Sequence, residues 1–145
     1  MQALIQRVKE ASVVVNGVTI GEIEVGILLL LGVEKHDERV NLTKLLHKSV
    51  NYRIFPDDKG HMNLSLLDIG GELLVVSQFT LAANTHKGLR PSFSSAAAPE
   101  LAESLYEEFI SEAKVQVSKV ETGKFGADMA VRLLNDGPVT FLLSA

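Results

Sequence analysis

The sequence predicts a single α+β domain over residues 1–145, with two mostly antiparallel β-sheets and two amphipathic helices. Short segments rich in β-branched and apolar residues recur along the chain between turn residues, which is typical of strands. Two longer segments repeat apolar residues at the spacing of a helix surface. No linker, internal repeat or low-complexity segment interrupts the 145 residues, a length that one hydrophobic core can hold together.

The first third of the chain is predicted to form strands. Ala3–Val8, Ser12–Val15 and Val18–Ile20 are rich in β-branched residues. Asn16-Gly17 lies between the second and third of these segments and is a strong signal for a hairpin turn. Ile27–Leu31 is a continuous apolar run, which is typical of a strand buried on both faces.

Two amphipathic helices are predicted. The first runs from Asp37, its expected N-cap, to about Asn51. Its expected core-facing side chains are Val40, Leu45, Leu46 and Val50. The second begins at Pro99, because proline suits the first turn of a helix. Its apolar row is Leu101, Leu105 and Phe109, at the spacing i, i+4, i+8.

The remaining segments are predicted strands, interrupted by one long loop. Tyr52–Phe55 should end at the turn Pro56–Gly60, and Glu72–Phe79 should follow Gly70-Gly71. The stretch Ala82–Ala98 is irregular in pattern, and long loops in compact domains are often functional. The C-terminal strands are predicted at Val115–Val120, Met129–Leu134 and Val139–Leu143.

Composition and charge limit the class of function. A net charge of −4 argues against a general nucleic-acid binder, so any such contact must be local, as in the basic segment His86–Arg90. The plainer reading of that segment is an ordinary solvated loop. The chain has no cysteine, which excludes disulfides, thiolate catalysis and cysteine-bound zinc and fits a reducing cytosol. The N-terminus lacks a signal-peptide pattern, and Ile27–Leu31 is too short to cross a bilayer, so we expect a cytoplasmic protein without membrane contact.

Most catalytic machineries lack their signatures in this sequence. It contains no Gly-x-Ser-x-Gly elbow, no phosphate-binding loop of the Walker type and no dinucleotide fingerprint. The four histidines lack the spacing of metal ligands and are expected to be ordinary surface or helix residues: His36, His47, His61 and His86. We therefore expect neither a metal nor a cofactor.

Two short motifs stand out. Ser77–Leu81 places three polar side chains at the end of an apolar run, where they need partners or water. This motif is either a core strand that continues its alternation or a strand end that opens onto a cleft. Asn135–Thr140 contains Gly137-Pro138, which the residues alone allow as a hairpin turn. Because only about 5–6% of X–Pro bonds in folded proteins are cis, the sequence alone favours a trans bond there.

Both motifs resemble the signature motifs of D-aminoacyl-tRNA deacylases. The resemblance continues in order along nearly the whole chain, through Ile5-Gln6-Arg7-Val8, Met62-Asn63-Leu64-Ser65, Arg90-Pro91-Ser92-Phe93 and Glu121–Met129. The loop Ala82–Gly88 departs from the family pattern, in which an aromatic residue, an acid and an arginine are usual. This departure puts the RNA contacts of that loop in question.

The resemblance implies the fold of that family (DTD-like), a homodimer, and hydrolysis of the ester of D-aminoacyl-tRNA or of mischarged glycyl-tRNA. It assigns catalysis to Ser77, Gln78, Phe79 and Thr80, substrate binding and chiral selectivity to Gly137, Pro138 and Met129, and tRNA contacts to Lys87 and Arg90. In that family a Gly–Pro segment with a cis bond enters the pocket of the partner subunit and excludes L side chains. The ribose 2′-hydroxyl of the tRNA 3′ end assists the attacking water.

Two other functions remain open on the residues alone. A non-catalytic dimeric module that binds RNA or single-stranded DNA ends is slightly favoured by the missing general base in the motifs and by the substitutions in the loop Ala82–Gly88. The intact pair of motifs argues strongly against it. A hydrolase of small metabolite esters is the other possibility. Thr80 could act as a nucleophile only if a neighbour activated it, and no residue near it in the sequence does so; we expect it to position the substrate.

Overall fold

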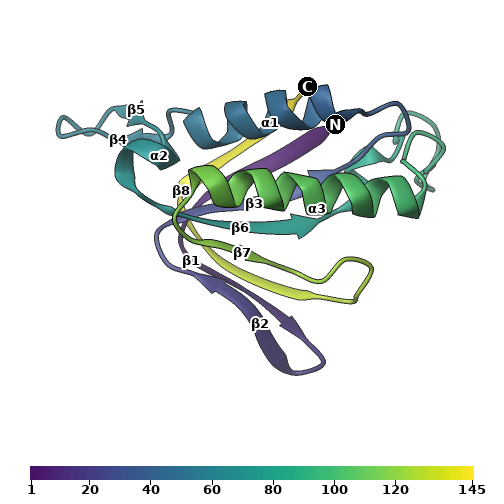
Figure 1. Cartoon of the computed structure of the whole chain (residues 1–145), viewed down its shortest axis with the longest axis horizontal. Coiled ribbons are helices and arrows are strands. Elements are labelled where there is room, and N and C mark those ends of the chain that lie inside the picture. The colour runs from purple at the N-terminus through teal and green to yellow at the C-terminus, as the bar shows by residue number, and fades with distance from the viewer.

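The computed structural model describes residues 1–145 and contains a large curled sheet with two helices packed against it (Figure 1). The strands of the large sheet are β1 (Gln2–Val15), β2 (Val18–Ile23), β3 (Gly26–Gly32), β6 (Glu72–Ser77), β7 (Val120–Thr122) and β8 (Ala130–Ser144). A separate pair consists of β4 (Phe55–Pro56) and β5 (Met62–Leu64). The predicted α+β class is confirmed, with two sheets of very unequal size.

The long strand β1 organises the large sheet. The strands follow the order β2-β1-β3-β6-β7, and β8 also pairs with β1. All pairs that involve β1 are antiparallel, whereas β3–β6 and β6–β7 are parallel. The parallel pairing brings the C-terminal ends of β3 and β6 to the same edge, with Leu31 opposite Ser77. The first sequence motif therefore begins at a sheet edge.

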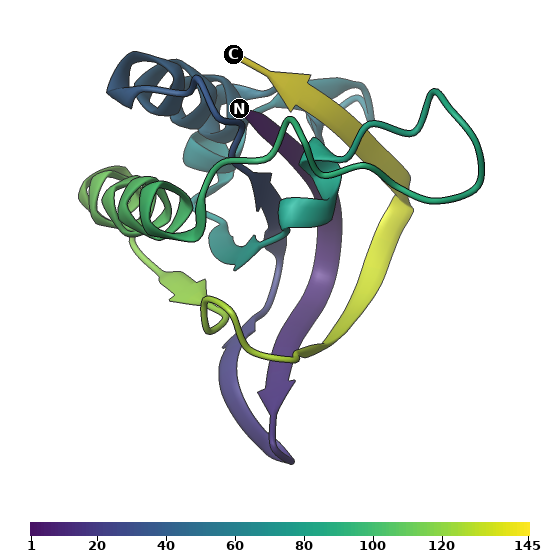
Figure 2. The same cartoon turned by 90° about the vertical axis from the view of Figure 1, so that its right-hand side faces the viewer.

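The two predicted amphipathic helices are present and lie side by side on one face of the sheet (Figure 2). They are α1 (Arg39–Asn51) and α3 (Pro99–Gln116), and the chain also forms a short helix α2 (Leu66–Ile69) and a 3-10 helix η1 (Phe79–Ala82). The guanidinium of Arg39 joins α1 to α3 through Glu108 at 2.9 Å and Glu112 at 3.1 Å. None of these helices is long and apolar enough to span a membrane.

The main core lies between the sheet and the two helices. Its fully buried side chains include Ile5 and Leu29 from the sheet and Phe109 from α3. A smaller cluster covers the opposite face of the sheet: Val8, Ala11, Val13, Ile23, Leu28, Leu74 and Val76. Because Leu28 and Leu29 alternate between these clusters, β3 is buried on both faces, as its apolar run predicted.

The start of the first helix differs from the prediction. Asp37 does not cap α1, because its carboxylate accepts hydrogen bonds from the α-ammonium of Met1 at 2.6 Å and from the backbone N–H of Glu34 at 2.7 Å. The N-cap is Glu38, whose N–H donates to the side chain of Asn41 at 2.9 Å. The prediction that Val40 faces the core is also wrong, since this side chain is 52% exposed.

Several strand boundaries also differ from the prediction. The two predicted N-terminal strands are one continuous strand, β1, which ends in the predicted hairpin turn, with positive φ at Asn16 and Gly17. Residues 52–54 are not in a strand, and the structure has only the two-residue β4 at Phe55–Pro56. The predicted strand Val115–Val120 is wrong except for its last residue, because α3 continues to Gln116 and β7 begins only at Val120. The packing of α3 against the core decides where this helix ends, and the β-branched residues after Lys114 do not predict that position.

Candidate active site

A cavity of about 520 Å³ opens at the edge where β3 and β6 end. Its walls come from the ends of these strands, the start of η1, the first turns of α3 and the segment before β8. Most of the wall is apolar. The residues that line it are Leu31, Val33, Val76, Ser77, Gln78, Phe79, Ala97, Pro99, Ala102, Tyr106, Phe125, Gly126, Ala127, Asp128, Met129 and Val131.

The first motif is a strand end that opens onto this cavity. Ser77 is the last residue of β6, and the N–H of Gln78 still donates to the carbonyl of Leu31 at 2.8 Å. The chain then turns into η1, which packs closely on β3 because Gly32 has no side chain; a Cβ there would lie 2.8 Å from the Cβ of Leu81. The prediction that the strand continues to Phe79 is therefore wrong.

The hydroxyl groups of this motif have no base beside them. The amide of Gln78 donates to the Oγ1 of Thr80 at 2.6 Å, and no histidine or carboxylate contacts that oxygen. Ser77 and Gln78 line the cavity, whereas Thr80 lies in η1 outside the lining set. The structure thus places an amide–hydroxyl pair at the cavity mouth and supplies no activated nucleophile.

Tyr106 and Phe125 form an aromatic wall that the motifs did not indicate. The hydroxyl of Tyr106 donates to the carbonyl of Val75 at 3.0 Å, and its ring centroid lies 5.8 Å from that of Phe125. Burial raises the pKa of Tyr106 to about 12. Tyr106 is therefore a neutral phenol at physiological pH, and its proton is already used in a bond to the backbone. In the sequence, Tyr106 has only the spacing of a core-facing helix residue, and this spacing does not indicate a site.

Met129 is placed in the wall by a glycine. A Cβ on Gly123 would lie 2.5 Å from the sulfur of Met129, and the N–H of Lys124 points at the same sulfur at 3.4 Å. Beside Met129, Asp128 is the only carboxylate that lines the cavity, and it is exposed. Sequence reasoning passed over Asp128 because it lies in neither motif.

The second motif is part of one long strand, so a hairpin turn at this point is wrong. Gly137–Pro138 lies within β8, where the pairing with β1 shifts register, and its peptide bond is cis, contrary to the preference of the sequence alone. The side chain of Asn135 holds the backbone on the far side of Gly137–Pro138. Its Oδ1 accepts a hydrogen bond from the N–H of Val139 at 2.7 Å, and its Nδ2 donates to the Val139 carbonyl at 3.2 Å. The conformation of Gly137 does not rely on a positive φ.

Arg7 holds the same segment from the neighbouring strand. Its Nε donates to the carbonyl of Asp136 at 2.8 Å, and another guanidinium nitrogen donates to the carbonyl of Ile54 at 2.6 Å. The carboxylate of Asp136 lies 3.5 Å from that Nε. Asp136 is a carboxylate within the second motif, which the motif reading did not take into account; it faces Arg7. Gly137 and Pro138 are exposed and do not line the cavity of their own chain.

Lys87 and Arg90 lie outside the cavity. Both are exposed residues of the long loop that follows η1. The structure therefore brings Ser77, Gln78, Phe79 and Met129 together. It leaves the loop cations and the Gly137–Pro138 segment on the surface.

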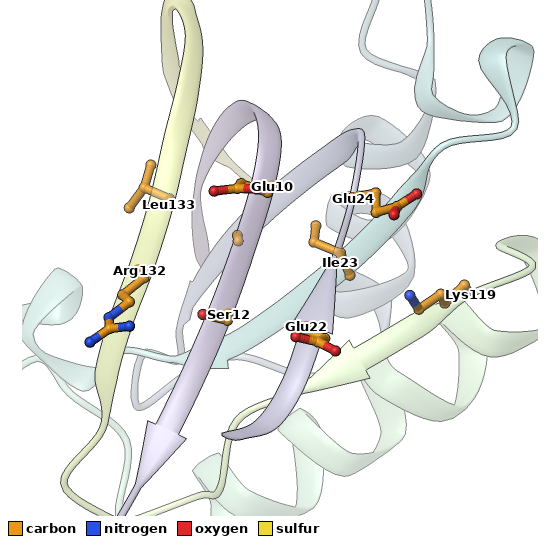
Figure 3. A pocket seen from close by; sticks show the side chains of 9 residues that line it. Glu10, Ser12, Glu22, Ile23, Glu24, Lys119, Arg132 and Leu133 are labelled. Carbon is orange, nitrogen blue, oxygen red and sulfur yellow. The ribbon is translucent and has the colours of Figure 1, made fainter. Parts of the chain in front are cut away.

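A second cavity, of about 460 Å³, lies over the second half of β1, the end of β2 and the start of β8 (Figure 3). Charged side chains dominate its lining, among them Glu10, Glu22, Glu24, Lys119 and Arg132. Lys119 is paired with Glu72 at 3.0 Å. Burial opposes ionisation of Glu72, but the N–H of Glu24 and the Lys119 ammonium outweigh it and hold the pKa of Glu72 below its usual value. This cavity contains no residue of either motif, and nowhere do three His, Asp or Glu side chains gather closely enough to hold a metal ion.

Comparison with known proteins identifies the chemistry of relatives. A family model described as D-Tyr-tRNA(Tyr) deacylase matches residues 4–144. The chain is 62% identical to the D-aminoacyl-tRNA deacylase of Teredinibacter turnerae, over 100% of both chains. It is 64% identical to that of Pseudoalteromonas translucida, over 99% of both chains.

Two solved structures share this fold. A c-Myc DNA unwinding element binding protein is 40% identical, with a TM-score of 0.96 over 100% of this chain and 99% of that one. A probable eukaryotic D-amino acid tRNA deacylase is 18% identical, with a TM-score of 0.83 over 99% of this chain and 98% of that one. The second comparison concerns the fold alone.

Proposed function

The chain belongs to the D-Tyr-tRNA(Tyr) deacylase family and is a D-aminoacyl-tRNA deacylase, a hydrolase of an ester bond, and we propose that it works in the cavity at the end of β6. The observation that carries this assignment is the meeting of the strand-end motif, Met129 and the aromatic wall around one apolar cavity. Such a cavity fits the terminal adenosine and its ester, since aromatic rings and a thioether pack well against a nucleobase.

Backbone groups are the proposed source of transition-state stabilisation. The N–H groups of Phe79 and Thr80 open the first turn of η1, where a helix offers them no preceding acceptor. Donors fixed in this way suit the oxygen that becomes negative when water attacks the ester carbonyl. The ester carbon loses its bond to the ribose oxygen, which takes a proton and leaves as free tRNA. The ribose 2′-hydroxyl next to the ester assists the attacking water.

Substitution of the motif hydroxyls tests this mechanism. Thr80→Ala and Ser77→Ala are expected to lower kcat for D-tyrosyl-tRNA by about tenfold each, because they loosen the cavity mouth without removing a nucleophile. A chelator should leave the rate unchanged. Rates are measured by release of labelled tyrosine, with Thr43→Ala on α1 as the control for loss of an exposed threonine. A covalent acyl group trapped on Thr80 and found by mass spectrometry would contradict the proposal.

Selectivity for the D configuration is proposed to come from Gly137–Pro138 of a partner subunit. The segment is exposed, held rigidly by Arg7 and Asn135, and absent from the cavity of its own chain. Its strand β8 pairs only with β1, and Leu134 and Leu142 on it are 51% and 61% exposed, which suits burial against a second copy. A rigid backbone at this position excludes the side chain of an L-aminoacyl substrate by steric contact, whereas a glycyl substrate has no side chain to exclude.

The deciding experiment compares tRNA substrates that carry a D-amino acid, an L-amino acid or glycine. Purified protein should hydrolyse D-tyrosyl-tRNA and glycyl-tRNA and leave L-tyrosyl-tRNA intact. Labelled amino acid released over time is the readout, and uncatalysed hydrolysis of each ester is subtracted. Equal hydrolysis of the D and L substrates would disprove selectivity by exclusion. Since the substrate is charged tRNA, the place of action that we propose is the cytoplasm.

A second candidate function comes from one relative, the c-Myc DNA unwinding element binding protein. A non-catalytic role in binding single-stranded DNA ends would need an extended basic surface, because phosphate contacts dominate such binding. The chain has a net charge of −4 and offers only local basic groups. This second function would be favoured if the protein bound single-stranded DNA in competition with tRNA and also failed to hydrolyse D-tyrosyl-tRNA when no DNA was present.

A further inference from the structure

We propose that Phe79 and Phe93, together with Lys87 and Arg90, bind the single-stranded nucleotides that precede the terminal adenosine of the tRNA. The proposal rests on the proposed function, since it assigns a surface to the part of the RNA that leaves the cavity. We call these four residues the platform. Both rings are exposed, the segment that carries them has basic residues and no acidic ones, and hydrogen bonds close the base of the loop.

The two rings of the platform lie together at the mouth of the cavity and outside the core. Phe79 is 61% exposed and Phe93 is 41% exposed. Their ring centroids are 5.0 Å apart, with the ring planes inclined at 48°. Phe79 also lines the cavity, so the pair continues the apolar wall to the outside. Nucleobases stack on such rings regardless of sequence, because every base has a π-face.

The charge of the chain segment that carries both rings, residues 73–99, favours a polyanion. The sequence has no acidic residue between Glu72 and Glu100, although the whole chain has a net charge of −4. Lys87 and Arg90 lie within this interval, and neither is engaged in an ion pair. Free cations on the same loop as an exposed aromatic ring suit the binding of single-stranded nucleic acid, which combines phosphate contacts with base stacking. An apolar peptide partner would gain nothing from the cations.

Hydrogen bonds hold the loop that contains the cations. Asn84 and Ser92 exchange backbone hydrogen bonds of 2.7 and 3.1 Å, and the side chain of Asn84 accepts from the N–H of His86 at 2.9 Å. The hydroxyl of Ser95 donates to the carbonyl of Ala82 at 2.5 Å. The loop is thereby closed at its base, and its tip projects from the body of the molecule (Figure 2). The cations are presented to solvent on the same segment as Phe93.

Kinetics on a whole and a truncated substrate test the platform. D-tyrosyl-adenosine carries the ester and the terminal nucleoside but none of the preceding nucleotides. Phe93→Ala should lower kcat/KM for D-tyrosyl-tRNA by about tenfold, the loss expected for one stacked base, and should affect D-tyrosyl-adenosine at least fivefold less. Phe93→Tyr, which keeps the ring, should restore the rate on tRNA.

The cations are tested by salt dependence. Replacing both Lys87 and Arg90 with alanine should flatten the plot of log KM for tRNA against log salt by a slope of about 1.4, because each contact to a single-stranded phosphate contributes roughly 0.7. Lys44→Ala, which removes an exposed cation on α1, is the matched control and should leave this slope unchanged. An unchanged slope in the double variant would overturn the role of the cations.

Other outcomes separate the platform from the proposed function. Equal losses on the two substrates would place Phe93 in the chemistry and overturn the platform. A change of oligomeric state in Phe93→Ala, seen by sedimentation, would assign the rings to a second copy and overturn it as well. If unmodified protein hydrolysed neither substrate, the proposed function would fail. Fluorescence anisotropy with an uncharged single-stranded RNA ending in cytidine-cytidine-adenosine would then still decide the platform, by comparing Phe93→Ala with unmodified protein.

Discussion

Replacing Gly137 with alanine is expected to lower kcat/KM for D-tyrosyl-tRNA by about 100-fold, the loss typical of a misplacement of about 1 Å at a reacting site. A Cβ at this position would lie 2.5 Å from the backbone nitrogen and 2.6 Å from the Cγ2 of Val139. Val139 is 5% exposed and its N–H is bonded to Asn135, so it does not give way. The Gly137–Pro138 segment must move instead.

The control for this variant is Gly71→Ala, where a Cβ would lie 2.7 Å from the Cδ1 of Leu66, before the start of β6 and so at the end of that strand opposite to the first motif. Both variants should unfold at lower temperature than the unmodified protein, but only Gly137→Ala should lose activity per folded molecule. Thermal unfolding and active-site kinetics are measured on the same samples. Retention of activity within twofold in Gly137→Ala would contradict a role of this segment in the site.

Phe109→Ala is expected to reduce the free energy of unfolding by about 3–5 kcal/mol, because it removes a large side chain from a closed core. Phe109 is fully buried between α3 and the sheet. Leu101→Ala on the same helix is the matched control, since Leu101 is 37% exposed; its expected loss is below about 1 kcal/mol. Urea unfolding followed by circular dichroism measures both. Similar losses in the two variants would show that α3 does not pack as described.

Short local patterns in the sequence were a good guide wherever neighbouring residues decide the structure. Ile27–Leu31 forms a strand buried on both faces, Pro99 begins a helix, and Asn16-Gly17 forms the predicted hairpin turn. In each case the residues next to one another in the chain carry the signal. The apolar pattern was less reliable for single positions: Leu101, predicted in the apolar row of its helix, is partly exposed, whereas Phe109 is buried.

Predictions that depend on distant partners were wrong. Asp37 has the right side chain for an N-cap, but the ammonium of Met1 at 2.6 Å occupies its carboxylate. The two C-terminal segments were read as separate strands, yet pairing with β1 carries β8 through Gly137–Pro138 without a hairpin turn. Neither partner is near in sequence, so no local pattern contains the information.

The sequence by itself determined the class of fold, the two helices, the family resemblance and the motif residues that line the cavity, because these follow from periodicity and from short strings of residues. Only the tertiary structure decided that Tyr106, Phe125 and Asp128 complete the cavity wall, and that Arg7 holds the carbonyl of Asp136. These contacts join segments that lie far apart in the chain. Their formation depends on sheet register and helix packing, which are properties of the whole fold rather than of any one segment.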